Sequence, residues 1–499
     1  MKKFTAILAT AAMAITMVGG TLNVSAAAGD TDLTIAVDSD IDTLHASDFS
    51  TTIESSILNQ IYDTLLYMNP DGEHDPEPRI AESYTISDDG LDYTFYLRDD
   101  ETFHDGTALT AADVKFSLEL YMNSNYQGDK VTGLSSVEVV DDYTVVCHLE
   151  SAYSPFLLGV CQVYIASEAY YESSADDFAS SPVGSGPYKF VSRTKGSNIV
   201  LEAYDGYYRG EAAIQTLTYE VIPDQSTTAI ALQTGEIDFA EIDSSILTQL
   251  AANSSIRIEE VSTSGFSYVC MNLDTEPFDN VLVRQAINYA LNRENIVAVC
   301  YDGEAEVNSN ICSKDRFGYS EDQLQYTYDP DKAIELLEEA GIETPYDLGT
   351  LLVAEKYSNL ATVIQSDLAA VGLNVEISVQ EFNSYLTDLT SGSYDITVLE
   401  MTLDGDTQSL EMAFTTDYIG TANNARYSDE EMDQLFADAQ VESDTDARAE
   451  IFNQIFTKAQ EEAIYAVICN PLTVYAYNSE LTCPEFAFEG DYFVYDFSW

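Results

Sequence analysis

The pattern of hydrophobic and polar positions first predicts β-strands. Residues 91–98 alternate between apolar and polar with a period of two, which is typical of a half-buried strand. Residues 33–37 and 143–149 are short runs rich in β-branched and aromatic residues, which predict two further strands.

Other segments repeat their apolar residues with the period of a helix. Residues 280–293 place apolar side chains along one stripe, which predicts an amphipathic helix. Residues 330–341 begin with a proline in the first turn and end at Gly341, and residues 53–68 also read as a helix. Because strands and helices alternate throughout, the sequence predicts an α/β fold.

Two short motifs predict where helices begin. Thr110 is followed three residues later by Asp113, and Ser428 is followed by Glu431. Both pairs have the spacing of a capping box, in which two side chains satisfy amides at the start of a helix.

The composition indicates how large the cores can be and which binding partners the charge disfavours. The chain has 499 residues, of which 45% are hydrophobic, so it can bury sizeable cores in more than one domain. It carries 20 Lys and Arg against 86 Asp and Glu, a net charge of −66. Such a charge repels nucleic acid and anionic lipid and suits an exported protein that must stay soluble. We therefore expect no nucleic-acid partner.

The first 28 residues have the form of a secretory signal peptide. Two lysines precede an apolar run, and small residues follow up to Ala28. We expect export to the cell envelope, periplasm or exterior, without a lipid-anchor cysteine near the cleavage site. No later stretch is long and apolar enough to predict a membrane span.

Motifs for catalysis are missing from the sequence. H-E-x-x-H, G-x-S-x-G, a Walker A loop and G-x-G-x-x-G do not occur. The seven cysteines are widely spaced without a C-x-x-C pair, and Asp38, Asp40 and Asp42 lack the glycine and glutamate of an EF-hand loop. We expect a binding protein that is not an enzyme and needs neither a cofactor nor a metal.

Ordered motifs then point to a known family. Residues 78–84, 87–98, 103–107 and 109–116 resemble closely the signature of the extracellular solute-binding proteins of peptide and nickel ABC importers. Further matches follow in the order of that family, at 61–65, 182–188, 235–238, 277–278, 283–287, 328–341 and 394–395.

This resemblance implies a two-lobed, hinged periplasmic-binding-protein fold with an extra domain inserted in the first lobe. Residues 29–66, 183–263 and 470–499 would form lobe I, residues 67–182 the extra domain, and residues 264–469 lobe II. The lobes would close around a ligand and present it to a permease in the membrane. We expect a monomer.

The resemblance also implies a ligand site between the lobes. In peptide-binding members an aspartate that follows the Tyr-Asp strand binds the ligand's ammonium group. The matching residue is Asp404, with Asp406 as the second choice. Glu400 and Met401 stand where peptide binders usually have Gly-Trp. The other candidate ligand-binding residues are Thr402, the lobe I loop Ser50, Thr51 and Thr52, and the more distant Asp243 and Tyr475.

Besides a purely structural acidic surface protein, three functions remain open at this point. The leading one is a receptor that captures peptides for an ABC importer. A second keeps the fold but binds an oligosaccharide, with tyrosines as stacking surfaces, or a metal complex. The third is a secreted hydrolase that uses an unrecognised pair of acids.

Overall fold

A computed structural model describes most of the chain. The described residues are 31–67, 76–175, 177–263, 265–314, 316–401, 407–483, 486 and 492–499. The signal peptide predicted for residues 1–28 lies outside these ranges. Within them, no helix combines the length and the apolar character that crossing a bilayer requires.

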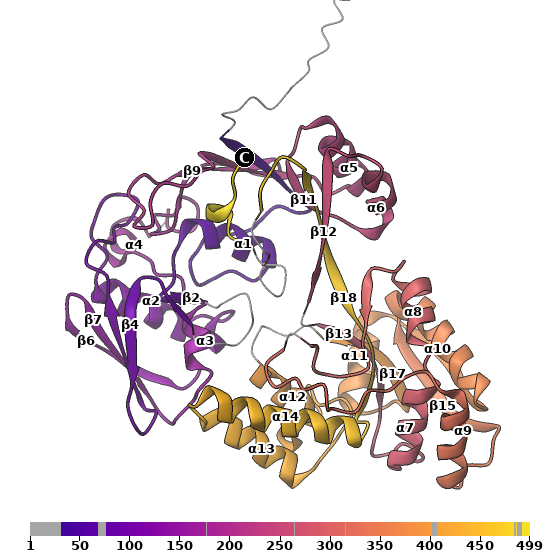
Figure 1. The fold of residues 1–499 in the computed structure, drawn as a ribbon. Helices are drawn as coiled ribbons and strands as arrows, with labels where there is room; N and C mark the ends of the chain where they lie inside the picture. The colour runs from indigo at the N-terminus through magenta and orange to yellow at the C-terminus, as the bar shows by residue number, and fades with distance from the viewer. Residues whose placement is uncertain are drawn as a thin grey trace, which may run out of the picture. The chain divides into compact units, whose positions relative to one another are not determined.

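One long sheet runs through both lobes because strand β18 (Tyr465–Asn478) is shared between them (Figure 1). The strand order is β16-β15-β17-β13-β18-β11-β1-β10-β9-β8, and β12 and β14 also pair with β18. The strands are β1 (Asp32–Val37), β8 (Tyr188–Thr194), β9 (Asn198–Ala203), β10 (Thr216–Val221), β11 (Phe239–Glu241), β12 (Ile256–Ser262), β13 (Phe266–Met271), β14 (Ala305–Val307), β15 (Tyr346–Ala354), β16 (Leu373–Gln380) and β17 (Ile396–Met401). Parallel pairs join β1 to β10 and β11, and β15 to β16 and β17.

A separate antiparallel sheet lies in the segment predicted as the extra domain. Its order is β4-β5-β7-β6. These strands are β4 (Ala81–Ile86), β5 (Asp92–Leu97), β6 (Leu134–Asp141) and β7 (Thr144–Leu149). A two-stranded ribbon, β2 (Leu66–Tyr67) with β3 (Glu77–Pro78), precedes it.

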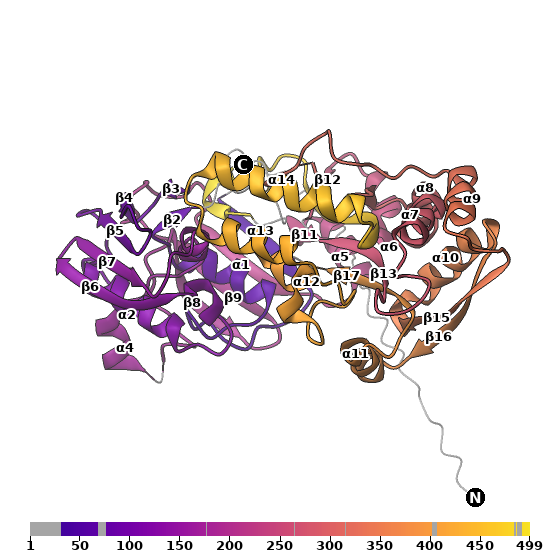
Figure 2. The same ribbon diagram turned by 90° about the horizontal axis from the view of Figure 1, so that it is seen from below.

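The helices pack around these sheets (Figures 1 and 2). In lobe I and the extra domain they are α1 (Thr52–Ile61), α2 (Ala111–Met122), α3 (Phe156–Val160), α4 (Glu168–Ser174), α5 (Gln225–Thr234) and α6 (Ser244–Ala251). In lobe II they are α7 (Val281–Ala290), α8 (Arg293–Cys300), α9 (Pro330–Glu339), α10 (Ser358–Ala370), α11 (Phe382–Ser391), α12 (Glu411–Phe414), α13 (Glu430–Val441) and α14 (Thr445–Glu461). Helices α13 and α14 lie side by side (Figure 2).

The hydrophobic residues form several distinct cores. The largest extends from Phe266 to Cys469, within the segment predicted as lobe II. A second joins β1, α1, β9 and β10 to the C-terminal segment, a third fills the extra domain, and a smaller one lies under α5 and α6. Strand β18 contributes to three of them, since Ile468, Tyr475 and Ala476 lie in different cores. The domain boundaries given above remain predictions.

Most of the predicted elements are present. The strands predicted at 33–37, 91–98 and 143–149 are β1, β5 and β7, and the helices predicted at 280–293 and 330–341 are α7 and α9. Helix α2 begins after Thr110, and the carboxylate of Asp113 accepts the backbone N–H of Thr110 at 3.0 Å.

The helix predicted over 53–68 is too long, because α1 ends at Ile61. Tyr62 is already extended, with φ −111° and ψ 154°. The loop that contains Gly184 and Gly186 packs against this end, and the amide of Gly186 donates to the carbonyl of Ile61 at 2.9 Å. A partner distant in sequence therefore satisfies the carbonyl at which the helix stops.

The capping box predicted at Ser428 and Glu431 is also wrong. Asp429 is the N-cap of α13, and its carboxylate accepts the amide of Met432 at 2.9 Å. The hydroxyl of Ser428 lies instead 3.0 Å from that of Thr416. Asp and Ser are both good N-caps, and the more C-terminal of the two occupies the position here.

Candidate ligand-binding site

Strand β17 carries the described part of the predicted site. It lies between β13 and β15 in lobe II, and its last two residues are Glu400 and Met401. Met401 is half-buried and pairs with Phe266 at the start of β13. Thr402, Asp404 and Asp406 lie outside the described residues, so their roles stay predictions.

Glu400 lies in a network that the sequence did not predict. Its carboxylate accepts the hydroxyl of Tyr357 at 3.2 Å and that of Tyr301 at 3.4 Å, and it forms an ion pair with Lys356 at 3.2 Å. The ammonium of Lys356 also lies 4.4 Å from the centre of the Tyr357 ring. Glu400 therefore has a compensating positive charge beside it, and Lys356 keeps more than half of its side chain exposed.

The tyrosines of this network remain neutral hydrogen-bond donors. Burial, followed by the nearby Glu400 carboxylate, raises the pKa of Tyr357 well above its usual range. Burial is also the largest cause of the raised pKa of Tyr301. A neutral phenol donates its proton to the carboxylate, which fixes the position of Glu400 at the end of β17.

The three partners of Glu400 come from two separate segments. Tyr301 follows α8, and Lys356 and Tyr357 follow β15, the strand that runs parallel to β17. The ends of parallel strands that point the same way meet at one edge of a sheet, where α/β proteins place their ligands. The apolar run at residues 351–354, which the sequence analysis did not single out, forms the end of β15, and the position of Lys356 just after it was the signal that could have identified this lysine.

In lobe I, Ser50, Thr51 and Thr52 lie exposed at the start of α1. Thr51 is the N-cap, and its hydroxyl accepts the amide of Glu54 at 3.2 Å. In return the Glu54 carboxylate accepts the amides of Ser50 at 2.9 Å and Thr51 at 3.2 Å. Two of the loop's three amides are thus already used by Glu54, and the carbonyl of Thr51 accepts the amide of Ser55 at 3.1 Å.

The two remaining candidates differ in accessibility. Asp243 is the exposed N-cap residue of α6, and the next residue, Ser244, donates its hydroxyl to Asp302 of lobe II at 3.3 Å. Tyr475 is only 5% exposed, and Phe486 stacks on its ring at a centroid distance of 4.7 Å. Phe239 and Tyr492 also contact this ring, so Tyr475 offers a ligand little surface.

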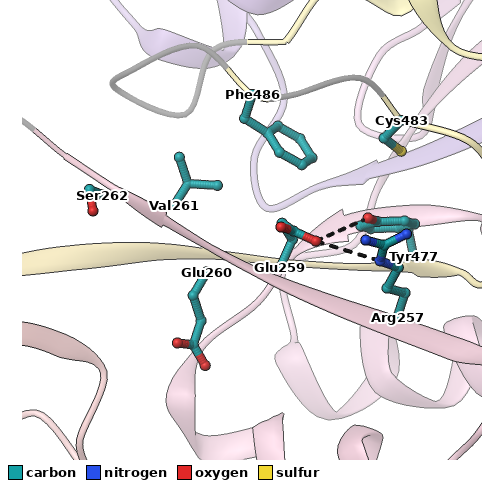
Figure 3. Close-up of a pocket in the computed structure, with 8 residues that line it drawn as sticks. All are labelled: Arg257, Glu259, Glu260, Val261, Ser262, Tyr477, Cys483 and Phe486. Atoms are coloured by element: carbon teal, nitrogen blue, oxygen red, sulfur yellow. Dashed lines mark hydrogen bonds and ion pairs between the residues drawn. The ribbon is translucent and has the colours of Figure 1, made fainter. Parts of the chain in front are cut away.

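A cavity of about 440 Å³ lies beside β12 (Figure 3). The residues that line it are Arg257, Glu259, Glu260, Val261, Ser262, Tyr477, Cys483 and Phe486. The hydroxyl of Tyr477 donates to Glu259 at 3.4 Å, and Arg257 lies 3.6 Å from the same carboxylate. None of these residues was a sequence-based candidate.

The thiols and acidic groups form no metal site among the described residues. All seven cysteines are free. Burial raises the pKa of Cys270, Cys469 and Cys483 to about 12, so these thiols are protonated at neutral pH.

A sheet shared by two lobes, with polar groups gathered at the ends of its strands, defines a two-lobed solute-binding protein. The profile of the bacterial extracellular solute-binding proteins, family 5, matches residues 75–420. The chain belongs to this family.

Curated relatives and solved structures agree with this assignment. The chain is 28% identical to the dipeptide-binding protein of Escherichia coli over 432 residues, which cover 79% of this chain and 80% of that protein. It is 30% identical to heme-binding protein A of Haemophilus influenzae over 431 residues, 79% of each chain.

Two solved structures show the same fold. The ABC transporter substrate-binding protein CtaP of Listeria monocytogenes superposes with a TM-score of 0.82 at 25% identity, covering 94% of this chain and 99% of that one. The periplasmic binding protein DppA of Helicobacter pylori, in complex with the peptide STSA, gives 0.69 at 27% identity, with coverage of 90% and 94%.

Proposed function

We propose that this protein captures short peptides and delivers them to the membrane permease of an ABC importer. The observation that carries the proposal is the pair of opposite charges at the end of β17, where Lys356 lies beside Glu400. A peptide has an ammonium group at one end and a carboxylate at the other, so a site with both signs suits it. The relatives that bind dipeptides and the peptide STSA support the same ligand class.

Each end of the peptide has a proposed partner. The exposed ammonium of Lys356 binds the ligand's carboxylate, and Asp404, with Asp406 as the alternative, binds its ammonium. Met401 and Thr402 are proposed as further ligand contacts. From lobe I, the carbonyls and hydroxyls of Ser50 to Thr52 contact the peptide main chain, while Asp243 and Tyr475 lie further from it.

The protein acts outside the cytoplasm and performs no chemistry on its ligand. Residues 1–28 direct its export and are removed, and closure of the two lobes around the peptide creates the form that the permease binds. The protein works as a monomer. Intact mass of the exported protein tests the cleavage, and light scattering tests the monomer.

Thermal unfolding with added ligands tests the ligand class. A ligand that binds only the folded state raises the melting temperature, and at a hundred times its Kd it stabilises by about 2.7 kcal/mol. We expect shifts with members of a library of di- to pentapeptides. A shift with cello-oligosaccharides, heme or nickel–histidine, and none with any peptide, would overturn the proposal.

Charge-removing variants test the two ends separately. Lys356→Met should weaken binding of a free peptide, while C-terminal amidation of that peptide should weaken binding to the wild type but not to the variant. Asp404→Asn should also weaken binding of the free peptide, while N-acetylation of the peptide should weaken binding to the wild type but not to this variant. Lys332→Met is the control, since Lys332 is also an exposed lysine beside a glutamate, Glu335, but lies on α9. Equal losses in Lys332→Met and Lys356→Met would contradict the assignment.

A further inference from the structure

The segment predicted as the extra domain is fixed to lobe I by buried polar contacts. The ion pair of Arg79 with Asp63, at 2.8 Å, is one of them. The hydroxyl of Tyr121 donates to the carbonyl of Ala46 at 2.8 Å, and both residues are buried. Because breaking such contacts would leave charged and polar groups unpaired in the interior, the two segments move as one body.

Lobe II is joined to this body where β18 and the link from β12 to β13 cross between the lobes. The hydroxyl of Thr263 donates to the carbonyl of Pro471 at 2.8 Å, and the side-chain amide of Asn470 donates to the carbonyl of Gly265 at 2.8 Å. These bonds tie the two crossings side by side. A pair of adjacent crossings lets a lobe both bend and twist, so on its own it does not define a single axis of rotation.

A single residue of the extra domain makes a second contact with lobe II. Ser154 donates its amide to the carbonyl of Gln440 at 2.8 Å. Its hydroxyl lies 3.1 Å from the carbonyl oxygen of Ala439 and 3.2 Å from that of Gln440. Both carbonyls belong to the last turn of α13, where they have no partner within the helix. The extra domain therefore caps a helix of lobe II.

This contact is a separate point of support from the strand crossing. Helix α13 packs chiefly against α14, whereas the helices packed against β18 are α5, α7 and α8. Both sides of the contact are firmly held. Pro155 restricts the backbone of Ser154, and the guanidinium Nε of Arg448 on α14 donates to the carbonyl of Ala439 at 3.1 Å. The contact therefore joins two rigid elements.

Ser154 contacts α13 while the proposed peptide site is open. Lys356 keeps 58% of its side chain exposed, and Ser50, Thr51 and Thr52 on the lobe I side are exposed as well. A peptide held between closed lobes would cover these groups. A contact between the closing faces would be broken in this state, so Ser154 and α13 meet away from those faces.

We propose that Ser154 and the end of α13 form a second pivot of the hinge. A rigid lobe supported at two separate points can turn only about the line that joins them. Lobe II therefore closes on a ligand by rotating about the line from the crossing of β18 to Ser154, and the pivot suppresses its other motions. The inference rests on the proposed function, because a bound peptide is what closes the lobes.

The chemistry of the contact suits a pivot. A carbonyl oxygen accepts hydrogen bonds over a broad range of directions, and the hydroxyl of Ser154 can turn between two such oxygens. Small rotations of lobe II therefore keep these hydrogen bonds. A translation of about 1 Å would stretch the bond from Ser154 to Gln440 beyond the normal range.

Amide hydrogen exchange tests the pivot on the wild-type protein. The probe is the tightest-binding peptide of the library described above, at saturation. We expect the amide of Ser154 to be protected in the free protein and to exchange no faster when the peptide is bound. The amide of Phe156, which donates to the carbonyl of Tyr153 within the same loop, is the internal control.

The outcomes of this exchange experiment separate the two proposals. Exchange at Ser154 that becomes about tenfold faster on binding, with Phe156 unchanged, would overturn the pivot, because the contact would then belong to the open state alone. An unprotected Ser154 amide in the free protein would also overturn it. Both results leave the proposed function intact, which absence of binding by every peptide overturns.

Two substitutions of nearly equal size give a second test. Ser154→Asn keeps a side-chain donor for the carbonyls of α13, whereas Ser154→Asp places a carboxylate against the negative end of that helix. We expect Ser154→Asp to weaken peptide binding about tenfold, because an unsupported lobe II loses more freedom on closing. Ser154→Asn should bind within about twofold of the wild type. Melting temperatures of the free variants check that both fold.

The sign of the change in affinity decides this second test. Tighter binding by Ser154→Asp than by the wild type would mean that the contact holds the lobes open. Equal binding by Ser154→Asp and Ser154→Asn would mean that the contact plays no part in closure. Either result contradicts the pivot.

Discussion

Glu101 is a buried acid whose protonation should control stability. Its side chain is 2% exposed, and neither carboxyl oxygen has a hydrogen-bond partner in the described structure. Burial, followed by the negative charge of Asp63, raises the pKa of Glu101 to about 9, against 4.5 for an ordinary glutamate, although Arg98 opposes the shift. The folded protein at neutral pH therefore holds this carboxyl in its protonated form.

The magnitude follows from the two pKa values. Between pH 4.5 and 9 the folded chain keeps a proton that the unfolded chain has released, so rising pH favours the unfolded state. Each pH unit in this range lowers the free energy of unfolding by about 1.4 kcal/mol, so the step from pH 5 to pH 7 lowers it by about 3 kcal/mol. Glu101→Gln is neutral at every pH and should lack this dependence.

Denaturant unfolding of the wild type and Glu101→Gln at pH 5, 6, 7 and 8 measures the effect. All other titrating groups are shared, so the difference in unfolding free energy isolates Glu101. We expect the variant to gain on the wild type by about 1.4 kcal/mol for each pH unit. Parallel curves for the two proteins would refute the reasoning, because they would mean that Glu101 is ionised in the fold.

Three further predictions concern the region where the segments predicted as lobe I and the extra domain meet. Burial lowers the pKa of His104 to about 4, below the ordinary 6.5. The free energy of unfolding should therefore fall by about 3 kcal/mol as the pH drops from 6.5 to 4, because the unfolded chain takes up a proton that the folded chain does not. His104→Gln should lose this pH dependence in the same unfolding assay. Asp63 and Arg79 form a buried ion pair at 2.8 Å, so Asp63→Asn should cost about 3–5 kcal/mol by denaturant unfolding, and adding Arg79→Met should restore part of the loss. A Cβ on Gly184 would lie 2.0 Å from the carbonyl oxygen of Ile61, so Gly184→Ala should lower the free energy of unfolding by more than about 4 kcal/mol. Gly128→Ala is the control, because a Cβ there would have its nearest contact at 3.5 Å and should lower the melting temperature little.

Local patterns predicted the elements whose signals are local. The strands β5 and β7 follow from alternation, and α9 follows from Pro330 at its start and Gly341, with φ 78°, after its end. The end of α1 could not be predicted, because Gly186 satisfies the carbonyl of Ile61 from more than a hundred residues away. Such contacts arise only when distant segments meet.

The candidate site also contains one feature that the sequence could predict and others that depend on contacts between distant segments. Family motifs led to Glu400 at the end of a strand, which is where it lies. They could not show that Lys356 compensates its charge, since Lys356 follows a different strand and meets Glu400 only through the parallel pairing of β15 and β17. That β12 pairs with β18 alone among the described strands is likewise a property of the sheet order, which no single strand contains.

The positions of the cations show how the net charge of −66 is distributed between the interior and the surface. Arg284 and Arg293 are buried and donate to the backbone carbonyls of Glu462 and Val467, so their charges lie inside the fold while most acids remain outside. The resulting field attracts the ammonium end of a peptide and repels its carboxylate, over roughly 8–10 Å at physiological salt. A receptor with this surface therefore needs a local cation to hold the carboxylate. Lys356, held beside Glu400 and Tyr357, is a cation in that position.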